Sequence, residues 1–402
     1  MSGMGAGGAS AAVVFDQVDI LFGGRPERAL PLVEQGHSRE RILAETGQVV
    51  GVAGASLSIE PGQICVLMGL SGSGKSTLLR AVNRLNRVTR GRVLIQDDGR
   101  AVDVQACDAA TLRRLRTRRI AMVFQQFALL PWRTVAENVG FGLELRGMAA
   151  AERKRIVQEK LELVGLAQWA GKHADELSGG MQQRVGLARA FATDADILLM
   201  DEPFSALDPL IRMRLQDELL ELQRRLNKTI LFVSHDLDEA LKLGSTIAIM
   251  EDARIIQAGP PEEIVARPAT DYVRDFVANV NPLNVLTARH LMRDRHDLEP
   301  CGDGWLWLDR RRSTAVLLDD GGVLLQARHG QHDLSLVPME ALAGQSEQLA
   351  VARPAAPMRQ VIQIMNASGR PVPLVDEAGR LVGAVGMRDV LGAILRRHEQ
   401  PA

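Results

Sequence analysis

A glycine-rich segment that directly follows a short apolar run is the feature that most restricts how this chain can fold. Residues 64–68 have the composition of a buried strand, and residues 75–86 have the pattern of a helix. Between them, glycines let the backbone wrap a phosphate, a lysine places a cation against it, and a hydroxyl can bind Mg²⁺. The expected nucleotide-binding residues are Gly69, Leu70, Ser71, Gly72, Ser73, Gly74, Lys75, Ser76 and Thr77. A dinucleotide fingerprint is excluded, because the third glycine is missing and a lysine is present.

Further apolar runs alternate with segments of helical period between residue 13 and about residue 278. This alternation predicts an α/β domain with a largely parallel sheet, with the motifs at the ends of its strands. The expected strands cover residues 64–68, 120–124, 197–200, 230–233 and 247–250. Residues 1–12 are small and glycine-rich, without the charged and apolar regions of a signal peptide, so we expect a frayed tail.

Composition excludes several classes of function. The 402 residues suggest two or three domains, and the 48 basic against 49 acidic residues give no basic surface for a nucleic acid. Three distant cysteines without metal-ligand spacing indicate a reduced cytosolic compartment. No run of 18 apolar residues is present, so we expect no membrane-spanning helix, and any membrane role would be that of a peripheral subunit.

A second anion-binding turn lies downstream of the first. Ser178, Gly179 and Gly180 open an amphipathic helix, where free N–H groups and the helix dipole favour a negative charge. The full run is Glu176-Leu177-Ser178-Gly179-Gly180-Met181-Gln182-Gln183-Arg184. Such a turn has little local use, and two phosphate sites for one nucleotide need an explanation.

Paired carboxylates end the strand at residues 197–200. Asp201 is placed to hold Mg²⁺ through water, and Glu202 to orient and deprotonate an attacking water. An Asp-Glu pair after a buried strand is by itself more often the start of a solvated loop. The run Ser205-Ala206-Leu207-Asp208 reverses those odds only through the family resemblance given below. The same resemblance singles out Ser234-His235 after the strand at 230–233 and Gln125 after Met122-Val123-Phe124, because a lone histidine is usually structural and a glutamine at a strand end is unremarkable.

Together these motifs resemble those of the ATP-binding-cassette (ABC) ATPases over about two thirds of the chain. The resemblance implies a homodimer in which two copies pair head to tail, each placing Ser178, Gly179 and Gly180 on the ATP held by its partner, and it implies that Asp208 is a nucleotide-binding residue. It implies that His235 contacts the γ-phosphate and that Gln125 reaches Mg²⁺ and the attacking water. Phe22 is the candidate for stacking on adenine. Residues from about 126 to 180 would form a helical subdomain whose groove receives a helix of a membrane subunit.

An extra helical segment at residues 29–47 points to a subfamily. It is similar to the insertion carried by importers of glycine betaine, proline and choline, as are the runs 68–74, 124–131, 208–212 and 234–240. Residues 64–68 and 281–287 are most similar to those of choline importers. The resemblance implies two membrane-spanning permease subunits, an extracytoplasmic substrate-binding protein and a peripheral position on the cytoplasmic face of the bacterial inner membrane. No nucleic acid is expected as a partner.

The remaining residues, 279–402, are expected to form a regulatory region with an α+β module similar to a CBS domain, best over 354–398. The family's ligand-binding pattern places a hydroxyl three residues before an aspartate, whereas here Gly386 precedes Asp389. This departure puts adenine-nucleotide binding in doubt. Residues 285–343 are the candidate for a first, degenerate half. The cluster Arg310-Arg311-Arg312 is either a solvated face or a contact for anionic lipid.

Other functions remain open at this stage. The chain could import another small osmolyte or amino acid, or be an ABC ATPase that acts on DNA or ribosomes, or be a ligand sensor with an inert cassette. The single cassette and balanced charge argue against the second possibility, and the complete motif set argues against the third.

Overall fold

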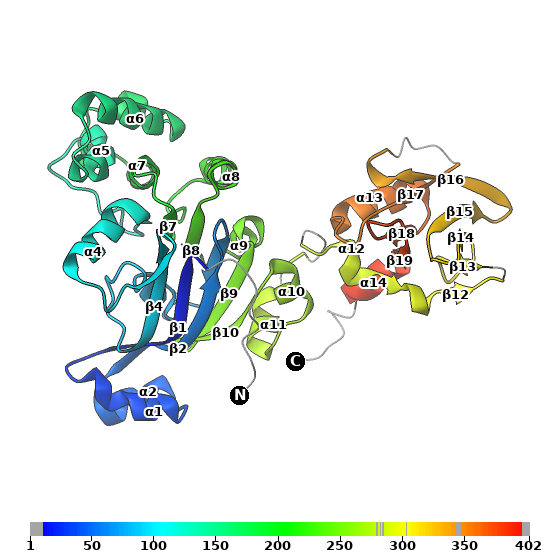
Figure 1. The fold of residues 1–402 in the computed structure, drawn as a ribbon, viewed down its shortest axis with the longest axis horizontal. Helices are drawn as coiled ribbons and strands as arrows, with labels where there is room; N and C mark the ends of the chain where they lie inside the picture. Colours follow the sequence, from blue (N-terminus) through cyan, green and yellow to red (C-terminus); the bar gives the residue numbers. More distant parts are fainter. Residues whose placement is uncertain are drawn as a thin grey trace. The chain divides into compact units, whose positions relative to one another are not determined.

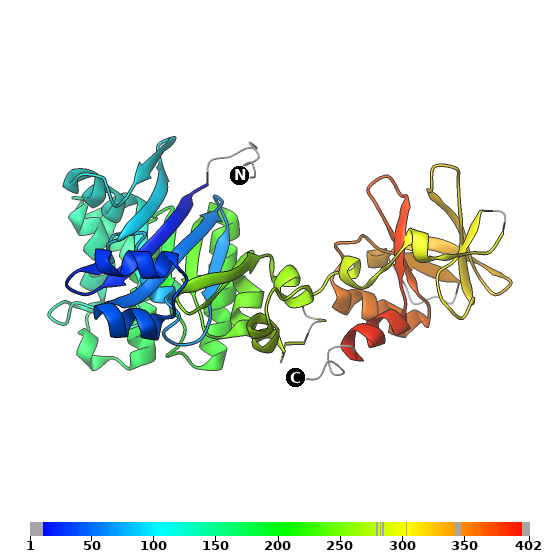
Figure 2. The same ribbon diagram turned by 90° about the horizontal axis from the view of Figure 1, so that it is seen from below.

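The computed structural model describes residues 11–278, 280–281, 283, 285–302, 304–341 and 347–395. The chain divides into two compact units, Met1–Pro261 and Glu262–Ala402, each of which is described by itself (Figures 1 and 2). The expected tail lies outside the described residues except for its last two positions, and so do positions 282 and 284 and the end of the expected module after residue 395.

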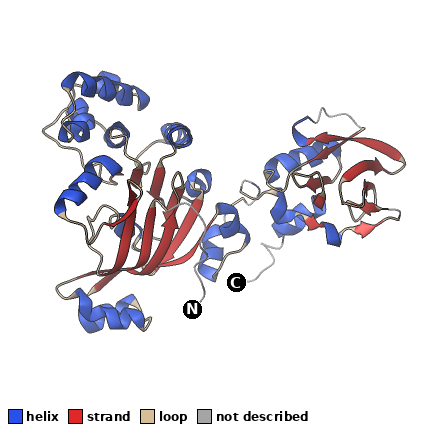
Figure 3. Cartoon of the chain, viewed as in Figure 1, coloured by secondary structure: helices blue, strands red, loops and turns tan. Residues whose placement is uncertain are grey.

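A six-stranded sheet forms the centre of the first unit (Figure 3). Five strands are parallel and the edge strand β10 is antiparallel to β9. In spatial order the strands are β10 (Arg254–Gly259), β9 (Thr246–Glu251), β3 (Ile64–Met68), β8 (Thr229–Val233), β7 (Ile197–Asp201) and β6 (Ile120–Val123). All five predicted runs are parallel strands, which confirms the α/β fold, and every residue of β3, β7 and β8 is buried.

A four-stranded antiparallel sheet packs against the first. Its order is β2 (Val49–Ile59), β1 (Val13–Phe22), β4 (Arg90–Asp97) and β5 (Arg100–Asp103). One apolar core joins the two sheets, with Phe15 and Ile95 on one side and Leu67 and Leu199 on the other. The largest of these side chains are essentially excluded from water, so this core holds the ends of β1, β3 and β7 in fixed positions.

Helices surround the sheets of the first unit. Helices α5, α6 and α7 lie together, well separated from α1 and α2 (Figure 1). The helices are α1 (Leu30–Glu34), α2 (Arg39–Thr46), α3 (Lys75–Leu79), α4 (Ala109–Arg114), α5 (Val135–Leu145), α6 (Ala150–Leu163), α7 (Gly179–Ala192), α8 (Pro209–Leu226) and α9 (Leu237–Leu243). A π-helical turn, Leu115–Arg119, follows α4, and 3₁₀ turns cover Pro26–Ala29, Ala167–Trp169 and Ala174–Glu176.

Helix α3 is shorter than the sequence predicted. The pattern predicted a helix to residue 86, but α3 ends at Leu79 and a series of tight turns follows. The carbonyl of Arg80 accepts from the N–H groups of both Leu85 and Asn86, and Arg84 has a left-handed backbone with φ of 56°. These bonds span five and six residues, so they close a turn in place of the four-residue spacing that an α-helix would need.

The second unit contains two sheets and five helices among its described residues. A three-stranded sheet has the order β11 (Arg293–Asp294), β19 (Leu381–Val385) and β18 (Val372–Val375). The other sheet runs through β12 (Glu299–Pro300), β13 (Trp305–Trp307), β14 (Thr314–Leu318), β15 (Leu324–His329), β16 (His332–Pro338) and β17 (Gln348–Val351). The helices are α10 (Pro261–Ala266), α11 (Asp271–Val277), α12 (Ala288–Leu291), α13 (Met358–Ser368) and α14 (Met387–Leu395), and 3₁₀ turns cover Arg295–Asp297 and Met339–Ala341.

The two parts of this unit differ in architecture. From α13 to α14 the order is helix, strand, strand, helix, with β18 and β19 at the predicted residues. The candidate first half does not repeat this order: the strands from β12 to β16 are successive antiparallel neighbours, without an intervening α-helix. This segment shares one apolar core with β19, formed by Leu308, Val316 and Leu334 of the segment and by Leu381 and Ala384 of β19. The segment is therefore a sheet that packs into the same core as the helix–strand–strand–helix part.

Candidate functional site

The phosphate loop leaves the end of β3 at the centre of the parallel sheet. Gly69 and Gly74 have φ of 138° and 100°, in the region that favours glycine. A Cβ atom on Gly74 would lie 2.3 Å from the carbonyl oxygen of Gly51, and one on Gly69 would lie 2.1 Å from that of Met250. The loop is therefore pressed against neighbouring strands, and both positions require glycine.

Lys75 begins α3 with its ammonium group folded into this loop. Its Nζ donates to the carbonyl oxygens of Gly69 and Leu70, both at 2.8 Å. Burial lowers the pKa of Lys75, and the charges of Glu202 and Asp201 oppose that shift. The loop therefore holds a cation at its centre, where the γ- and β-phosphates of a nucleotide would enter.

Asp201 is the last residue of β7 and is fully buried. Its Oδ1 accepts from the Ser76 hydroxyl at 2.7 Å, and its Oδ2 forms an ion pair with Arg80 at 2.9 Å. Both oxygens of the carboxylate are thus held by α3 and the turn that follows it. The arrangement gives a fixed pair of oxygen donors, from Asp201 and Ser76, beside the phosphate loop.

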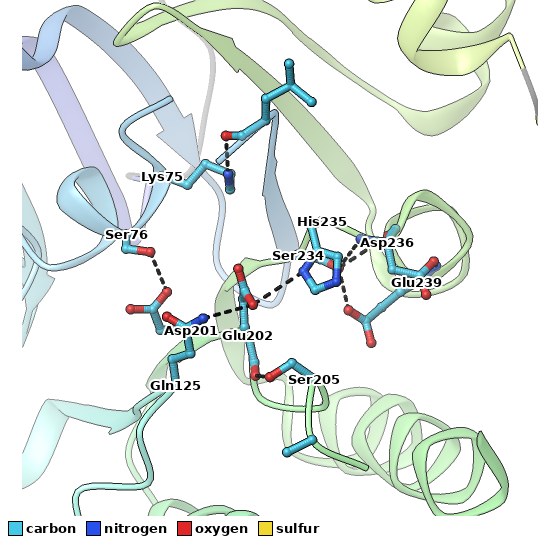
Figure 4. Close-up of polar contacts among 12 residues, drawn as sticks. Lys75, Ser76, Gln125, Asp201, Glu202, Ser205, Ser234, His235, Asp236 and Glu239 are labelled. Atoms are coloured by element: carbon cyan, nitrogen blue, oxygen red, sulfur yellow. Dashed lines mark hydrogen bonds and ion pairs between the residues drawn. The ribbon is translucent and has the colours of Figure 1, made fainter. Parts of the chain in front are cut away.

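Glu202 stands where three strand ends meet. Its Oε2 accepts from Nε2 of Gln125 at 3.1 Å and lies 3.3 Å from Nδ1 of His235 (Figure 4). Gln125 follows β6 and His235 follows β8, so the structure brings together the three residues that the sequence proposed as catalytic. Glu202 has a left-handed backbone with φ of 48°, and its N–H donates to the carbonyl of Val233 at 3.1 Å. Such a backbone is uncommon for a residue other than glycine, and it occurs here directly after the end of β7.

These residues line an open cleft of about 600 Å³. Phe22, the last residue of β1, lies at this cleft with 42 % of its surface exposed. A Cβ atom on Gly51 would lie 2.6 Å from the Phe22 ring, so glycine leaves room for the aromatic side chain. The lining residues are Phe22, Arg39, Val49, Gly51, Ser71, Gly72, Gly74, Lys75, Ser76, Thr77, Gln125, Glu202 and His235.

Gly69, Leu70 and Ser73 of the phosphate loop do not line the cleft, and neither do the four predicted nucleotide contacts at the starts of α7 and α8. Ser178 caps α7 by accepting from the N–H of Met181 at 3.4 Å, and Gly179 and Gly180 form the first turn. Asp208 caps α8 by accepting from the N–H of Ile211 at 3.0 Å. Ser178, Gly179 and Asp208 are exposed. The free surface of these caps leaves them available to a second copy of the chain.

The structure adds three residues that sequence reasoning missed. Arg39 comes from α2 and lines the cleft, and Arg80 pairs with Asp201. Gln183 of α7 is buried, donates to the carbonyl of Glu202 at 3.0 Å and accepts from the N–H of Ala206 at 3.0 Å. Gln183 lies within the run from Glu176 to Arg184, and that run was the only feature of the sequence that pointed to it.

A buried acid, Glu239, lies on the helix that follows His235. Glu239 of α9 accepts from the hydroxyl of Ser234 and from Nε2 of Gln216, the latter at 2.9 Å. Burial raises the pKa of Glu239, although both hydrogen bonds and nearby Arg212 act in the opposite direction. The network ties the strand end that carries His235 to α8 and α9.

The aspartate of the CBS-like module already accepts hydrogen bonds from groups of its own chain. Asp389 accepts from the N–H of Gly386 at 2.9 Å and from Nε of Arg293 at 3.3 Å. Its side chain is only 14 % exposed. An internal arginine therefore neutralises the carboxylate at the position expected to meet a ribose.

Among the described residues, no helix combines the length and apolar character needed to cross a bilayer. The same part of the chain contains no group of three or more His, Cys, Asp or Glu side chains arranged to hold a metal ion.

The fold and the cleft together define a nucleotide-binding P-loop domain. The model of the ABC transporter family matches residues 52–205, and that of the CBS domain matches residues 345–396.

Several relatives share most of the chain's length. It is 44 % identical over 395 residues to the glycine betaine/proline betaine transport system ATP-binding protein ProV of Salmonella typhimurium, covering 94 % of this chain and 96 % of that protein. It is 40 % identical over 395 residues to the glycine betaine transport ATP-binding protein OpuAA of Bacillus subtilis, covering 96 % and 92 %.

Among solved structures, the dimeric bacterial ABC transporter cassette MJ0796 aligns with a TM-score of 0.54 and 28 % identity, covering 62 % of this chain and 98 % of the cassette. A post-hydrolysis dimer of that cassette holds ADP and Pi. The chain belongs to the ABC transporter family, among the ATP-binding subunits of the glycine betaine/proline betaine type. It is an ATP-hydrolysing subunit of an importer.

Proposed function

We propose that the chain powers the uptake of a quaternary ammonium compound. The names of its relatives support this: glycine betaine and proline betaine for the Salmonella protein, and glycine betaine for the Bacillus protein. A Listeria relative, 49 % identical over 277 residues, is named for glycine betaine and carnitine. Choline, which the sequence favoured, shares the quaternary ammonium group and stays a prediction beside glycine betaine and proline betaine.

The observation that carries the catalytic proposal is the convergence of Gln125 and His235 on Glu202. In this proposal the Glu202 carboxylate accepts the proton of the water that attacks the γ-phosphate. Gln125 orients the carboxylate and the water, and His235 contacts the γ-phosphate. The phosphate loop from Gly69 to Thr77 holds the triphosphate and Phe22 stacks on the adenine. Each role needs a side chain held in advance, and the strand ends provide that.

Mg²⁺ is the proposed metal, with Asp201, Ser76 and Gln125 as the residues that would hold it, Asp201 through water. The residues fit such an ion, because Ser76 and Asp201 present hard oxygen atoms 2.7 Å apart beside the phosphate loop. With Asp201 acting through water, Ser76 and Gln125 would be the two direct protein ligands, so phosphate oxygens and water would complete the shell. When bound, the ion would neutralise charge on the phosphates.

We propose a homodimer in which each Ser178-Gly179-Gly180 turn and each Asp208 meet the nucleotide held by the partner copy. The exposed caps of α7 and α8 support this arrangement, and so does the dimeric state of the MJ0796 cassette. Closing the dimer over two Mg-ATP would switch the membrane subunits from inward- to outward-facing, and hydrolysis would reset them.

The remaining partners are proposed to be two membrane-spanning permease subunits and an extracytoplasmic substrate-binding protein, with the chain on the cytoplasmic face of the bacterial inner membrane. A groove of about 570 Å³ is the proposed docking site of a permease helix. The groove is lined by the turns after α3 and by the segment after β6. The residues are Arg80, Leu85 and Asn86 from the turns, and Phe124, Gln125, Gln126 and Ala128 from the segment. Because Gln125 lines both this groove and the cleft, docking and nucleotide binding would be linked there.

Residues 13–278 are proposed as the nucleotide-binding domain and residues 279–402 as the regulatory region. The test of the function is uptake of radiolabelled glycine betaine, proline betaine and choline by the complete complex in vesicles, with external binding protein and internal ATP. Concentrative uptake of at least one compound, lost in Lys75→Ala, is the expected result. Uptake of none of the three would refute the proposed substrate class.

A further inference from the structure

An arginine of the inserted helices stands at the phosphate loop. Nη1 of Arg39, the first residue of α2, donates to the carbonyl oxygen of Gly72 at 2.8 Å. The same side chain lines the cleft together with Lys75 and Ser71. Arg39 is thus a second cation at this cleft, supplied by a segment 33 residues away from the loop that it contacts.

Among the described residues Arg39 has no ion-pair partner, although its charge acts on the carboxylate of the neighbouring Glu40. In the same part of the chain its side chain makes a single hydrogen bond, to a neutral carbonyl. Arg41, two positions along the same helix, differs: its Nε pairs with Glu45 at 2.6 Å. A guanidinium has five N–H donors and binds phosphate oxygens in pairs, so the remaining donors of Arg39 suit an anion in the cleft.

The insertion holds Arg39 in place through its own small core. Val33 of α1 and Ile42 of α2 are buried against Leu21 of β1 and Val50 of β2. Arg254 of β10 donates to the carbonyl of Val33 at 3.2 Å, and Glu34 pairs with Arg90 of β4. These contacts join the insertion to both sheets, so the position of Arg39 relative to the loop is set by packing.

The ends of α2 are also fixed. The hydroxyl of Ser38 accepts from the N–H of Arg41 at 3.3 Å, which caps the helix start at the residue before Arg39. Gly47 ends the helix with φ of 68°. A capped and packed helix limits the movement of its first side chain, which lowers the entropy cost of binding a ligand there.

We propose that Arg39 is a nucleotide-binding residue of this importer ATPase and that its guanidinium contacts the phosphate chain. The proposal rests on the nucleotide site proposed above. A phosphate contact is favoured over a contact with the base because Gly72, which positions the guanidinium, belongs to the phosphate loop. The inserted helices would therefore take part in ATP binding directly.

The test measures the dissociation constants of ATP, ADP and GTP for the full chain by competition with a fluorescent ADP analogue. Arg39→Ala is expected to weaken all three nucleotides by a similar factor, on the order of 10-fold, as expected for losing a hydrogen bond to a charged group. Arg39→Lys, which keeps the charge, should retain part of the affinity. Arg41→Ala is the matched control and should bind like the wild type.

Comparing Lys75→Ala with the wild type, and Arg39→Ala with Arg41→Ala, distinguishes a failure of the proposed nucleotide site from a failure of the role of Arg39. If Lys75→Ala binds nucleotide as well as the wild type, the proposed site itself is wrong. If Lys75→Ala loses binding while Arg39→Ala equals Arg41→Ala, the site stands and the role of Arg39 is refuted. A loss for ATP that is absent for GTP would also overturn the phosphate contact. Equal melting temperatures of the two arginine variants would exclude a folding effect.

Discussion

Replacing Glu202 by Gln should remove the proposed general base and leave its surroundings intact. Gln has nearly the same shape, so it can keep the backbone bond to Val233 and still present an oxygen to Gln125. It cannot accept the proton of the attacking water, and it carries no charge beside His235. The lysine and hydroxyls that would hold the phosphates are unchanged.

The expected loss follows from this chemistry. General base catalysis contributes about 10²–10⁴-fold, which corresponds to about 3–5 kcal/mol of transition-state stabilisation. The ATPase rate of the complete complex should fall by at least this factor, while ATP should now hold two copies together as a dimer. Glu221→Gln makes the same chemical change on an exposed position of α8 and should leave the rate unchanged.

The assay is steady-state phosphate release by the complex in vesicles, combined with size-exclusion chromatography of the isolated chain in the presence of ATP and Mg²⁺. Wild-type turnover in the Glu202→Gln variant would refute the role of Glu202. A large loss of rate with equally weakened ATP binding would assign Glu202 to the nucleotide cradle instead of the chemical step.

Two further predictions concern Glu239 and the C-terminal region. Burial raises the folded-state pKa of Glu239 above 4.5, so the stability of the wild type should fall as pH rises from about 4.5 towards that folded value. The Glu239→Gln variant should lack this fall. Parallel curves of melting temperature against pH for the two proteins would contradict the shift. For the C-terminal region, we expect little salt regulation. Arg310, Arg311 and Arg312 occupy an exposed turn in which Arg312 already pairs with Glu299 at 2.9 Å. Salt would weaken any contact of this cluster with anionic lipid, because it shortens the Debye length from about 10 Å at 0.1 M to about 3 Å at 1 M. Uptake measured against internal salt in anionic-lipid vesicles tests this, and a steep activation that is abolished by truncation after residue 279 would prove the expectation wrong.

Much of the parallel sheet could be predicted because buried parallel strands read as continuous apolar runs. Runs such as Ile64–Met68 and Ile197–Asp201 are too short for a typical helix and consist mostly of apolar residues, and the motifs follow them directly. The length of α3 could not be predicted, because residues 80–86 keep a helical composition while the carbonyl of Arg80 accepts from Leu85 and Asn86 and closes a turn there. Local pattern does not reveal such bonds.

The site residues divide in the same way. Lys75, Asp201 and Glu202 lie in motifs whose spacing indicates their chemistry, whereas Arg39 and Arg80 act through contacts that exist only after folding. Arg80 reaches Asp201 across 121 positions of the sequence. An arginine is usually a solvated surface residue, so neither one carries a signal by itself. The meander of β12 to β16 was missed because its strands are short and partly polar.

The most direct test of the account is hydrolysis by a dimer that mixes a Lys75→Ala chain with a Ser178→Arg chain. If Ser178 acts on the nucleotide of the partner, this dimer keeps one site with both halves intact, while a Lys75→Ala/Ser178→Arg double mutant keeps none. We predict hydrolysis in the mixed dimer well above that of the double mutant, given that one intact site suffices for turnover. Equal residual rates in the two preparations would contradict a site shared between two copies.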